Sequence, residues 1–156
     1  TRTTSETMRA VPFHYVDLRT FCYETEDEKR VETALRTFLP EEAELERDVT
    51  EGHNGDRIVI LSVRLERADD VRHVLSKLTE LGELDRLLDE LEARIDDNCA
   101  FYIGLDKQAA FRGDVSLGEG LMLRGKVEAY PAKRERAIET ASEALEDLAA
   151  RADSGH

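Results

Sequence analysis

The residues best suited to chemistry are arginines and aromatic residues that alternate with apolar ones in the strand-like segments of the chain. Side chains on one face of a strand recur at every second position, so alternation assigns each residue to a face. In residues 57–66, for example, Val59, Leu61 and Val63 form an apolar side and Arg64 lies on the other. Across four such strands the polar side collects Tyr15, Arg19, Phe21, Arg64, Tyr102, Arg124 and Lys126.

Arginine interleaved with aromatic residues on an open sheet is the kind of surface on which single-stranded nucleic acid stacks its bases. The polar face therefore predicts contacts to a polyanion through Arg19, Tyr102, Arg124 and Lys126. Two other interpretations stay open. Such a face is often only solvated, and the same face could dock a protein partner or a second copy of the chain as a homodimer.

A second group of polar residues lies in the segment LDKQAAFRG, which begins at Leu105. Lys107, Gln108 and Arg112 place two cations and an amide on one or two helical turns beside a basic strand, as a phosphate or base contact needs. The alternative is structural. The Ala-Ala-Phe between these residues would then fill the core, and the two cations would be solvated.

Signals for catalysis or metal binding are weaker. The four histidines lie on different predicted elements without a cysteine at metal-ligand spacing, so we expect no zinc site, no cofactor and no enzyme. Adjacent acids such as Asp96 and Asp97 leave an enzyme with a carboxylate-bound metal as a third hypothesis. Cys22 and Cys99 are too few for a disulfide framework, and we expect both to be buried and reduced.

Composition sets the background for these residues. The chain has 156 residues, enough for one domain, with 35 acidic and 22 basic side chains and a net charge of −13. Of the basic residues only 5 are lysine. Acid excess with scarce lysine is typical of a cytoplasmic protein from a salt-saturated cell, such as that of a haloarchaeon. In molar salt the Debye length is about 3 Å, so overall acidity does not repel a phosphate beyond contact range.

The charge is also unevenly distributed. Residues 99–136 hold 7 basic and 5 acidic side chains, a net charge of +2, whereas the rest of the chain is strongly acidic. This segment contains Arg112, Arg124 and Lys126. No apolar run is long enough to span a bilayer and no secretion signal is visible, so we expect no membrane partner.

The elements that must position these residues follow from periodicity. Thr25 and Glu28 form a possible capping box for a helix that Pro40 ends. Strands are expected at 13–23, 43–51, 57–66, 99–105 and 121–130, and helices at 25–39, 71–81, 84–95 and 137–149, with the short helical segment at 106–112. The order β-α-β-β-α-α-β-β-α predicts an α+β fold, with a single antiparallel sheet and helices packed on one face. Residues 1–12 are expected to be a frayed arm and 13–153 a single domain.

Three stretches resemble a known family: HYVDLRTFCYETED from His14, EGHNGDRIVILSVRLE from Glu51, and LDKQAAFRG from Leu105. Together they are similar to the archaeal family of RNA-binding domain proteins or predicted exosome subunits, formerly a domain of unknown function. The resemblance runs from about residue 13 to 131. It implies a fold like that of the large-subunit ribosomal protein that contacts 5S RNA. The motif residues that could touch a ligand are Arg19, Glu51, His53, Asn54, Asp106, Lys107, Gln108 and Arg112.

Our hypothesis from the sequence is a non-catalytic, cytoplasmic RNA-binding protein, accessory to RNA processing or to the exosome. Its partners would be RNA and a protein of an RNA-processing complex, and a dimer is possible. The alternative is a protein-interaction or homodimerisation module that uses the same sheet face. The expected RNA contacts are Arg19, Tyr102, Lys107, Gln108, Arg112, Arg124 and Lys126.

The charge of the chain leads to a first testable prediction. Dialysis from molar KCl into low-salt buffer should unfold the protein, because the repulsion among its excess carboxylates is then unscreened. Far-ultraviolet circular dichroism during a salt titration measures this loss. A secondary structure that is indifferent to salt would contradict the assignment to a salt-adapted protein.

Overall fold

A computed structural model describes residues 12–81 and 84–154, and within them the strands form one antiparallel sheet in the order β2-β3-β1-β5-β4. The strands are β1 (Phe13–Tyr23), β2 (Glu46–Glu51), β3 (Arg57–Leu65), β4 (Ala100–Asp106) and β5 (Gly120–Val127). The helices are α2 (Glu28–Arg36), α3 (Ala68–Leu78), α4 (Leu84–Asp89), α5 (Leu91–Arg94), α6 (Lys107–Phe111) and α7 (Arg134–Ser154). The arm expected at 1–12 lies, apart from Pro12, outside the described residues.

The central strand β1 organises the sheet. It pairs antiparallel with β3 on one side and with β5 on the other, so Leu18 stands opposite both Val63 and Leu123. Alternate β1 residues are buried, as the sequence predicts for a strand with one covered face. The buried hydroxyl of Thr20 donates a hydrogen bond of 2.7 Å to the Gly120 carbonyl, which leaves no polar side chain of β1 unsatisfied in the core.

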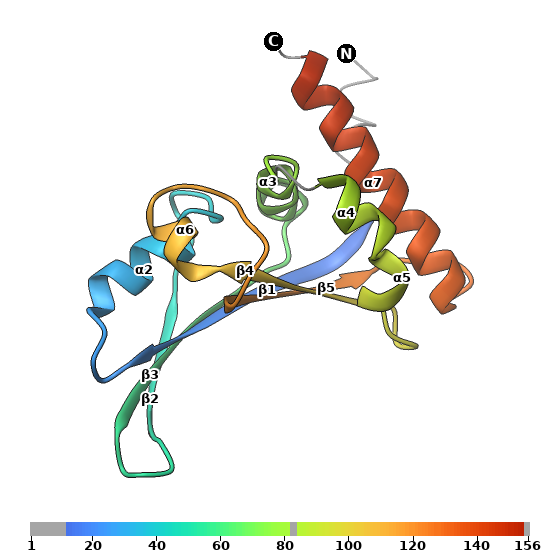
Figure 1. Cartoon of the computed structure of the whole chain (residues 1–156). Helices are drawn as coiled ribbons and strands as arrows, with labels where there is room; N and C mark the ends of the chain where they lie inside the picture. The colour runs from blue at the N-terminus through green and yellow to red at the C-terminus, as the bar shows by residue number, and fades with distance from the viewer. Residues whose placement is uncertain (1–11, 82–83, 155–156) are drawn as a thin grey trace.

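The helices gather over one face of this sheet (Figure 1). Each long helix carries a narrow apolar stripe, which for α3 consists of Val71, Val74, Leu75 and Leu78, all fully buried. The stripes and the apolar side of the sheet form one core cluster that runs from Phe13 to Leu145. The α+β fold with a single antiparallel sheet and helices is therefore confirmed.

All the expected helices have boundaries that differ from those predicted, and α2 differs at both ends. Helix α2 does not use the Thr25–Glu28 capping box. Instead Asp27 is the N-cap, and its carboxylate accepts a hydrogen bond of 3.0 Å from the Lys29 N–H. The helix also ends at Arg36 rather than at residue 39, because Phe38 and Leu39 continue in tighter turns that bury both side chains.

The segment expected as one helix over 84–95 is two short helices, α4 and α5. Arg134, at the start of α7, donates hydrogen bonds to the Glu92 and Ile95 carbonyls. Ile95 is extended and forms a bridge to Phe101 in β4. These contacts hold the end of α5, whereas the division between the two helices lies at Glu90, whose φ and ψ angles are −95° and 3°.

Both cysteines are buried and neither forms a disulfide, as expected. Cys99 was expected to begin the fourth strand, but it lies before Ala100 in the turn, with a φ angle of 63°. The Asp96 carboxylate closes this turn by accepting hydrogen bonds from the Asn98 and Ala100 N–H groups at 2.9 and 3.0 Å. Neither cysteine is placed to make a disulfide framework.

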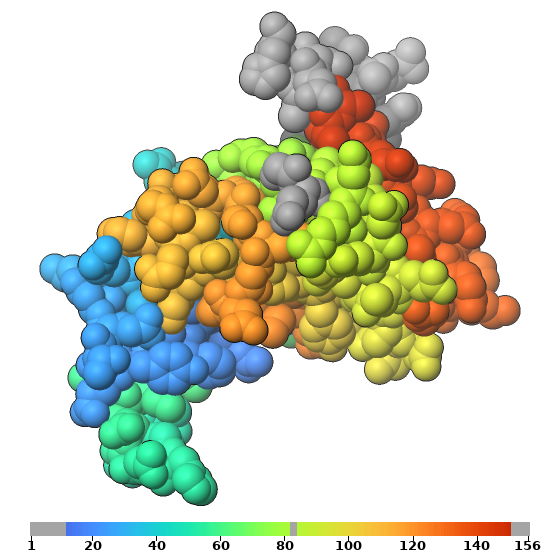
Figure 2. Space-filling view, viewed as in Figure 1, coloured from blue at the N-terminus to red at the C-terminus, as the bar shows by residue number. Residues whose placement is uncertain are grey.

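The two edges of the sheet are protected differently. Residues 114–119 run beside β4, where the Gly118 N–H donates to the Gly104 carbonyl at 3.1 Å. The other edge, β2, carries the exposed and highly charged sequence ERDVTE. The β2–β3 hairpin projects from the body of the molecule (Figure 2), so its tip adds to neither layer. In the part of the chain that the structure describes, no helix is long and apolar enough to cross a membrane.

A core substitution tests the central place of β1. Leu18→Ala should lower the free energy of unfolding by about 2–5 kcal/mol, because it leaves a cavity between two layers that are closely packed. Val49→Ala on β2, where the side chain is 53% exposed, should change it by no more than about 0.5 kcal/mol. Urea denaturation in molar KCl measures both. Equal effects of the two substitutions would contradict the assigned register.

Candidate nucleic-acid interface

The sheet face opposite the helices, here called the open face, displays the residues that alternation assigned to it. Its exposed apolar side chains include Phe21 at 36%, Tyr102 at 38% and Met122 at 48% exposure. Strand pairing orders them into rows across the sheet, in which residues that face each other on neighbouring strands share a face. One row reads Arg64–Asp17–Arg124–Tyr102 from β3 to β4.

Two of the charges in this row neutralise each other. The Arg64 guanidinium forms two hydrogen bonds with the Asp17 carboxylate, at 2.7 and 2.9 Å. The same guanidinium lies 4.0 Å from the centre of the Tyr15 ring, a cation–π contact that also holds it in place. The hydrogen bonds to Asp17 raise the pKa of Arg64. The Arg64 guanidinium is thus engaged in contacts within the protein.

Arg124 has a different environment. Its guanidinium lies 5.9 Å from the Tyr15 ring centre and 5.8 Å from that of Tyr102. Among the described residues it forms no ion pair, and its buried Nε has no hydrogen-bond acceptor. A guanidinium beside two rings, attracted to the Asp96 carboxylate but without a direct ion pair, keeps N–H groups for an external anion.

The other predicted cations of the open face differ from each other. Arg19 is exposed, lies 5.7 Å from the Phe21 ring centre, and has no ion pair in the described part of the chain. Lys126 is half-buried, and its ammonium donates a hydrogen bond to the Asn98 carbonyl. Arg19 and Arg124 are therefore the least committed cations of this face.

A hollow of about 340 Å³ lies on the open face between these side chains. Cations and apolar groups share its wall, so it can hold a flat ring and a phosphate together. Glu46, Ser62 and Met122 line the hollow but are not among the predicted contacts, because the neighbours of a residue across the sheet depend on strand register. The lining includes Arg19, Glu46, Ser62, Tyr102, Met122 and Arg124.

The basic turn on α6 is separate from the open face, because α6 lies on the helix side of the sheet (Figure 1). The structure therefore does not bring the seven predicted contact residues into one surface. Gln108 and Arg112 are exposed there, and Arg112 lies 3.9 Å from Asp114. The intervening Ala109 and Ala110 are buried, as the structural alternative for this segment requires.

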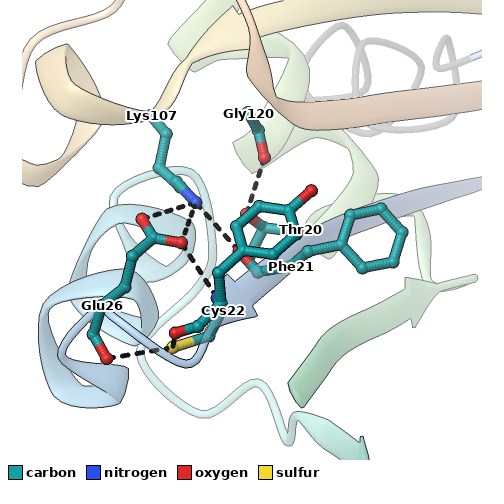
Figure 3. A network of polar contacts seen from close by, with 7 residues as sticks. Thr20, Phe21, Cys22, Glu26, Lys107 and Gly120 are labelled. Atoms are coloured by element: carbon teal, nitrogen blue, oxygen red, sulfur yellow. Dashed lines mark hydrogen bonds and ion pairs between the residues drawn. The ribbon is translucent and has the colours of Figure 1, made fainter. Parts of the chain in front are cut away.

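Lys107 has a structural environment. Its side chain is only 13% exposed, and its ammonium donates to the Phe21 carbonyl at 2.9 Å (Figure 3). The same ammonium pairs with both carboxylate oxygens of Glu26, at 2.9 and 3.1 Å. These bonds join α6 to β1 and to the turn before α2. The Lys107 ammonium is therefore engaged by acceptors of the protein itself.

The pKa of Glu26 reflects the same network. Burial of this carboxyl raises its pKa, but hydrogen bonds from the Tyr23 N–H and from Lys107 outweigh burial. The net result is a pKa below the ordinary glutamate value. The carboxylate form of Glu26 is thus stabilised by folding.

Asp96, one of the two adjacent acids, has hydrogen-bond partners within the protein. Asp96 accepts two backbone hydrogen bonds, from the Ala100 and Asn98 N–H groups, and these lower its pKa although partial burial opposes the shift. Tyr102 contributes a further hydrogen bond to the carboxylate. Among the described residues, no group of three or more His, Cys, Asp or Glu side chains is arranged to hold a metal ion.

Comparison with known proteins decides the family. A family model described as RNA binding matches residues 15–127, which include every strand of the sheet in part or in full. The chain belongs to this RNA-binding family. The match confirms the RNA-binding part of the resemblance in the three sequence stretches, and it covers all the residues that line the hollow.

Relatives of known sequence or structure are archaeal members of the family. An RNA-binding protein of Pyrococcus abyssi, PAB1135, is 35% identical over 144 residues, which cover 85% of this chain and 94% of the relative. The crystal structure of protein AF2318 from Archaeoglobus fulgidus, a DUF54 protein, has a TM-score of 0.76 at 32% identity, covering 85% of this chain and 99% of that one. Mth689, a DUF54 protein from Methanothermobacter thermautotrophicus, has a TM-score of 0.74 at 39% identity, covering 85% and 98%.

The Lys107–Glu26 pair yields a prediction about pH. Lys107→Met should lower the free energy of unfolding by about 1–3 kcal/mol near neutral pH, because it removes charged hydrogen bonds from a partly buried carboxylate. Glu26 has a depressed folded pKa, so this contribution is complete above the unfolded glutamate pKa of about 4.3 and is lost as pH falls through the lower folded pKa. The difference between variant and parent should therefore shrink in acid.

Gln108→Ala is the matched control for this experiment, since it changes the neighbouring exposed side chain of the same helix. It should change stability by less than about 0.5 kcal/mol at any pH. Urea titrations across a pH series measure both variants. A loss of stability in Lys107→Met that is the same in acid as at neutral pH would contradict the role of Glu26.

Proposed function

We propose that this protein binds RNA on its open face and performs no chemistry on it. Membership of the RNA-binding family and the name of the Pyrococcus abyssi relative support an RNA ligand. The observation that carries the proposed location is Arg124, stacked between Tyr15 and Tyr102 without an ion-pair partner among the described residues.

The side chains around Arg124 supply both parts of an RNA contact. Arg19 and Arg124 offer guanidinium N–H groups to phosphate oxygens, and Tyr102 and Phe21 offer exposed rings to bases. Stacking is worth about 1–3 kcal/mol per base, and molar salt does not screen it. Counterion release contributes less in molar salt, so we expect stacking to carry a large part of the affinity.

The acidity of the chain is compatible with this ligand. Close contacts are screened least, and phosphates at the open face would meet Arg19 and Arg124 directly. The Asp17 carboxylate on the same face is already neutralised by Arg64. An accessory place in RNA processing, including one beside the exosome, is part of the proposal and follows from the resemblance.

The second candidate is a protein-interaction or homodimerisation module. The exposed Phe21, Tyr102 and Met122 on one face favour it, because apolar groups gathered on a surface mark interaction sites. Size-exclusion chromatography with light scattering separates the two candidates. A stable dimer that is unaffected by RNA and is dissociated by Met122→Glu would support this second function over the first.

RNA binding is tested by fluorescence anisotropy with a labelled single-stranded RNA in molar KCl. Tyr102→Ala should weaken binding by about 5- to 100-fold, because one stacking ring is lost. Arg124→Ala should also weaken it. Tyr102→Phe keeps the ring and loses only the hydroxyl that bonds Asp96, so it should bind nearly as well as the parent.

Arg136→Ala is the matched control for charge. Arg136 is an exposed arginine of α7, on the helix side of the sheet, and its removal changes the net charge by the same amount as Arg124→Ala. It should leave RNA affinity unchanged. If the parent does not bind RNA, or if Arg136→Ala weakens binding as much as Arg124→Ala, the open face is not the binding site.

A further inference from the structure

Strand β2 turns its charges to opposite faces of the sheet. Arg47 points to the helix side, where its guanidinium forms hydrogen bonds of 2.7 and 3.0 Å with Glu28 of α2. Glu46, one residue earlier, pairs with Ser62 in the register and lines the hollow of the open face. The strand thus uses its cation for structure and presents a carboxylate where RNA is proposed to bind.

Glu46 is also the uncompensated carboxylate of the hollow. Asp17, the other acid in the lining, has its charge matched by Arg64 at 2.7 Å. Among the described residues Glu46 forms no ion pair and no side-chain hydrogen bond, and it is exposed. A bare carboxylate beside a phosphate backbone weakens binding unless it makes a favourable contact of its own.

The row that contains Glu46 leaves space for a flat ring. It reads Glu46–Ser62–Arg19–Met122–Gly104 from β2 to β4. Neighbouring strands lie about 4.8 Å apart, so the backbones of Glu46 and Arg19 are separated by roughly 10 Å. The short Ser62 between them forms the floor, while a carboxylate and a guanidinium form opposite walls. A base fits between these walls with polar partners at two of its edges.

Guanine is the base whose edges match both walls. Its N1–H and N2–H are adjacent donors that a carboxylate accepts together, and its O6 and N7 are the acceptors that arginine binds in pairs. Uracil has a single ring N–H, and adenine and cytosine lack an adjacent pair of donors of this kind. We propose that the hollow selects a guanine base of single-stranded RNA, with Glu46 accepting from N1–H and N2–H and Arg19 donating to O6 and N7.

This inference rests on the proposed function and concerns which base that site prefers. The probes are two labelled single-stranded RNAs of equal length, one of uridines only and one with isolated guanosines among uridines. The parent should bind the guanosine strand more tightly by about 5- to 100-fold, the discrimination that one bidentate base contact provides. Replacing each guanosine by inosine removes the N2 amino group and should lose part of that preference.

Glu46→Gln is the decisive variant, because it should change the affinities for the two RNAs in opposite directions. It should weaken binding of the guanosine strand and leave or strengthen that of the uridine strand, since a repelling charge is removed. Asp48→Asn is the matched control. Asp48 is the next acid of β2 on the open face, paired with Ile60 and outside the lining of the hollow, so its removal should affect both strands equally.

The outcomes separate this inference from the proposed function. If neither RNA binds to the parent, both are overturned. If the parent binds both RNAs with equal affinity, guanine selection is overturned and RNA binding stands. The same holds if Glu46→Gln changes the two affinities in the same direction and degree as Asp48→Asn. If Glu46→Gln alone changes the affinities for the two RNAs in opposite directions, the Glu46 carboxylate contacts the guanine base.

Discussion

The pairing of β1 with both β3 and β5 is the constraint on which the rest of the structure depends. A strand bonded on both sides cannot slip by one residue without moving its whole apolar set to the other face. Val16, Leu18 and Cys22 therefore stay under the helices, and Tyr15, Arg19 and Phe21 stay on the open face. The core and the candidate interface consequently depend on the same strand pairing. A change that disturbs the pairing of β1 would therefore disturb both faces of the sheet.

The cations of this acidic chain divide into those used within the protein and those left over. Lys107 ties α6 to β1, Arg134 ends α5, and Arg47 and Arg64 each hold a carboxylate with two hydrogen bonds. Arg19 and Arg124 stack on aromatic rings without ion pairs among the described residues. Ring stacking holds a guanidinium in place while leaving its N–H groups for a ligand. Counting charges along the chain could not separate these two groups.

Where the sequence prediction succeeded, the information was local. The alternation in residues 13–23 and 57–65 assigned faces correctly, and the apolar spacing from Val71 to Leu78 located α3. Where it failed, the deciding feature was not visible in the apolar spacing. The expected 84–95 helix breaks at Glu90, whose φ and ψ angles of −95° and 3° are not helical. Lys107, which the sequence presents as a basic residue on an exposed turn, forms a hydrogen bond with Glu26, 81 residues away. The predicted cap was also wrong. Asp27 and Thr25 are both acceptable N-caps, and the structure uses Asp27, whose carboxylate accepts a hydrogen bond from the Lys29 N–H.

By itself, the sequence determined which residues share a face of each strand, because side-chain direction alternates with a fixed period of two in any extended chain. It also determined the order of the strands and of the long helices, and it carried the family resemblance. Only the tertiary structure decided which residues stand side by side across the sheet, because the offset between strands depends on how turns and core close together. That offset places Glu46, Ser62 and Arg19 in one row across the sheet, so that all three line the same hollow.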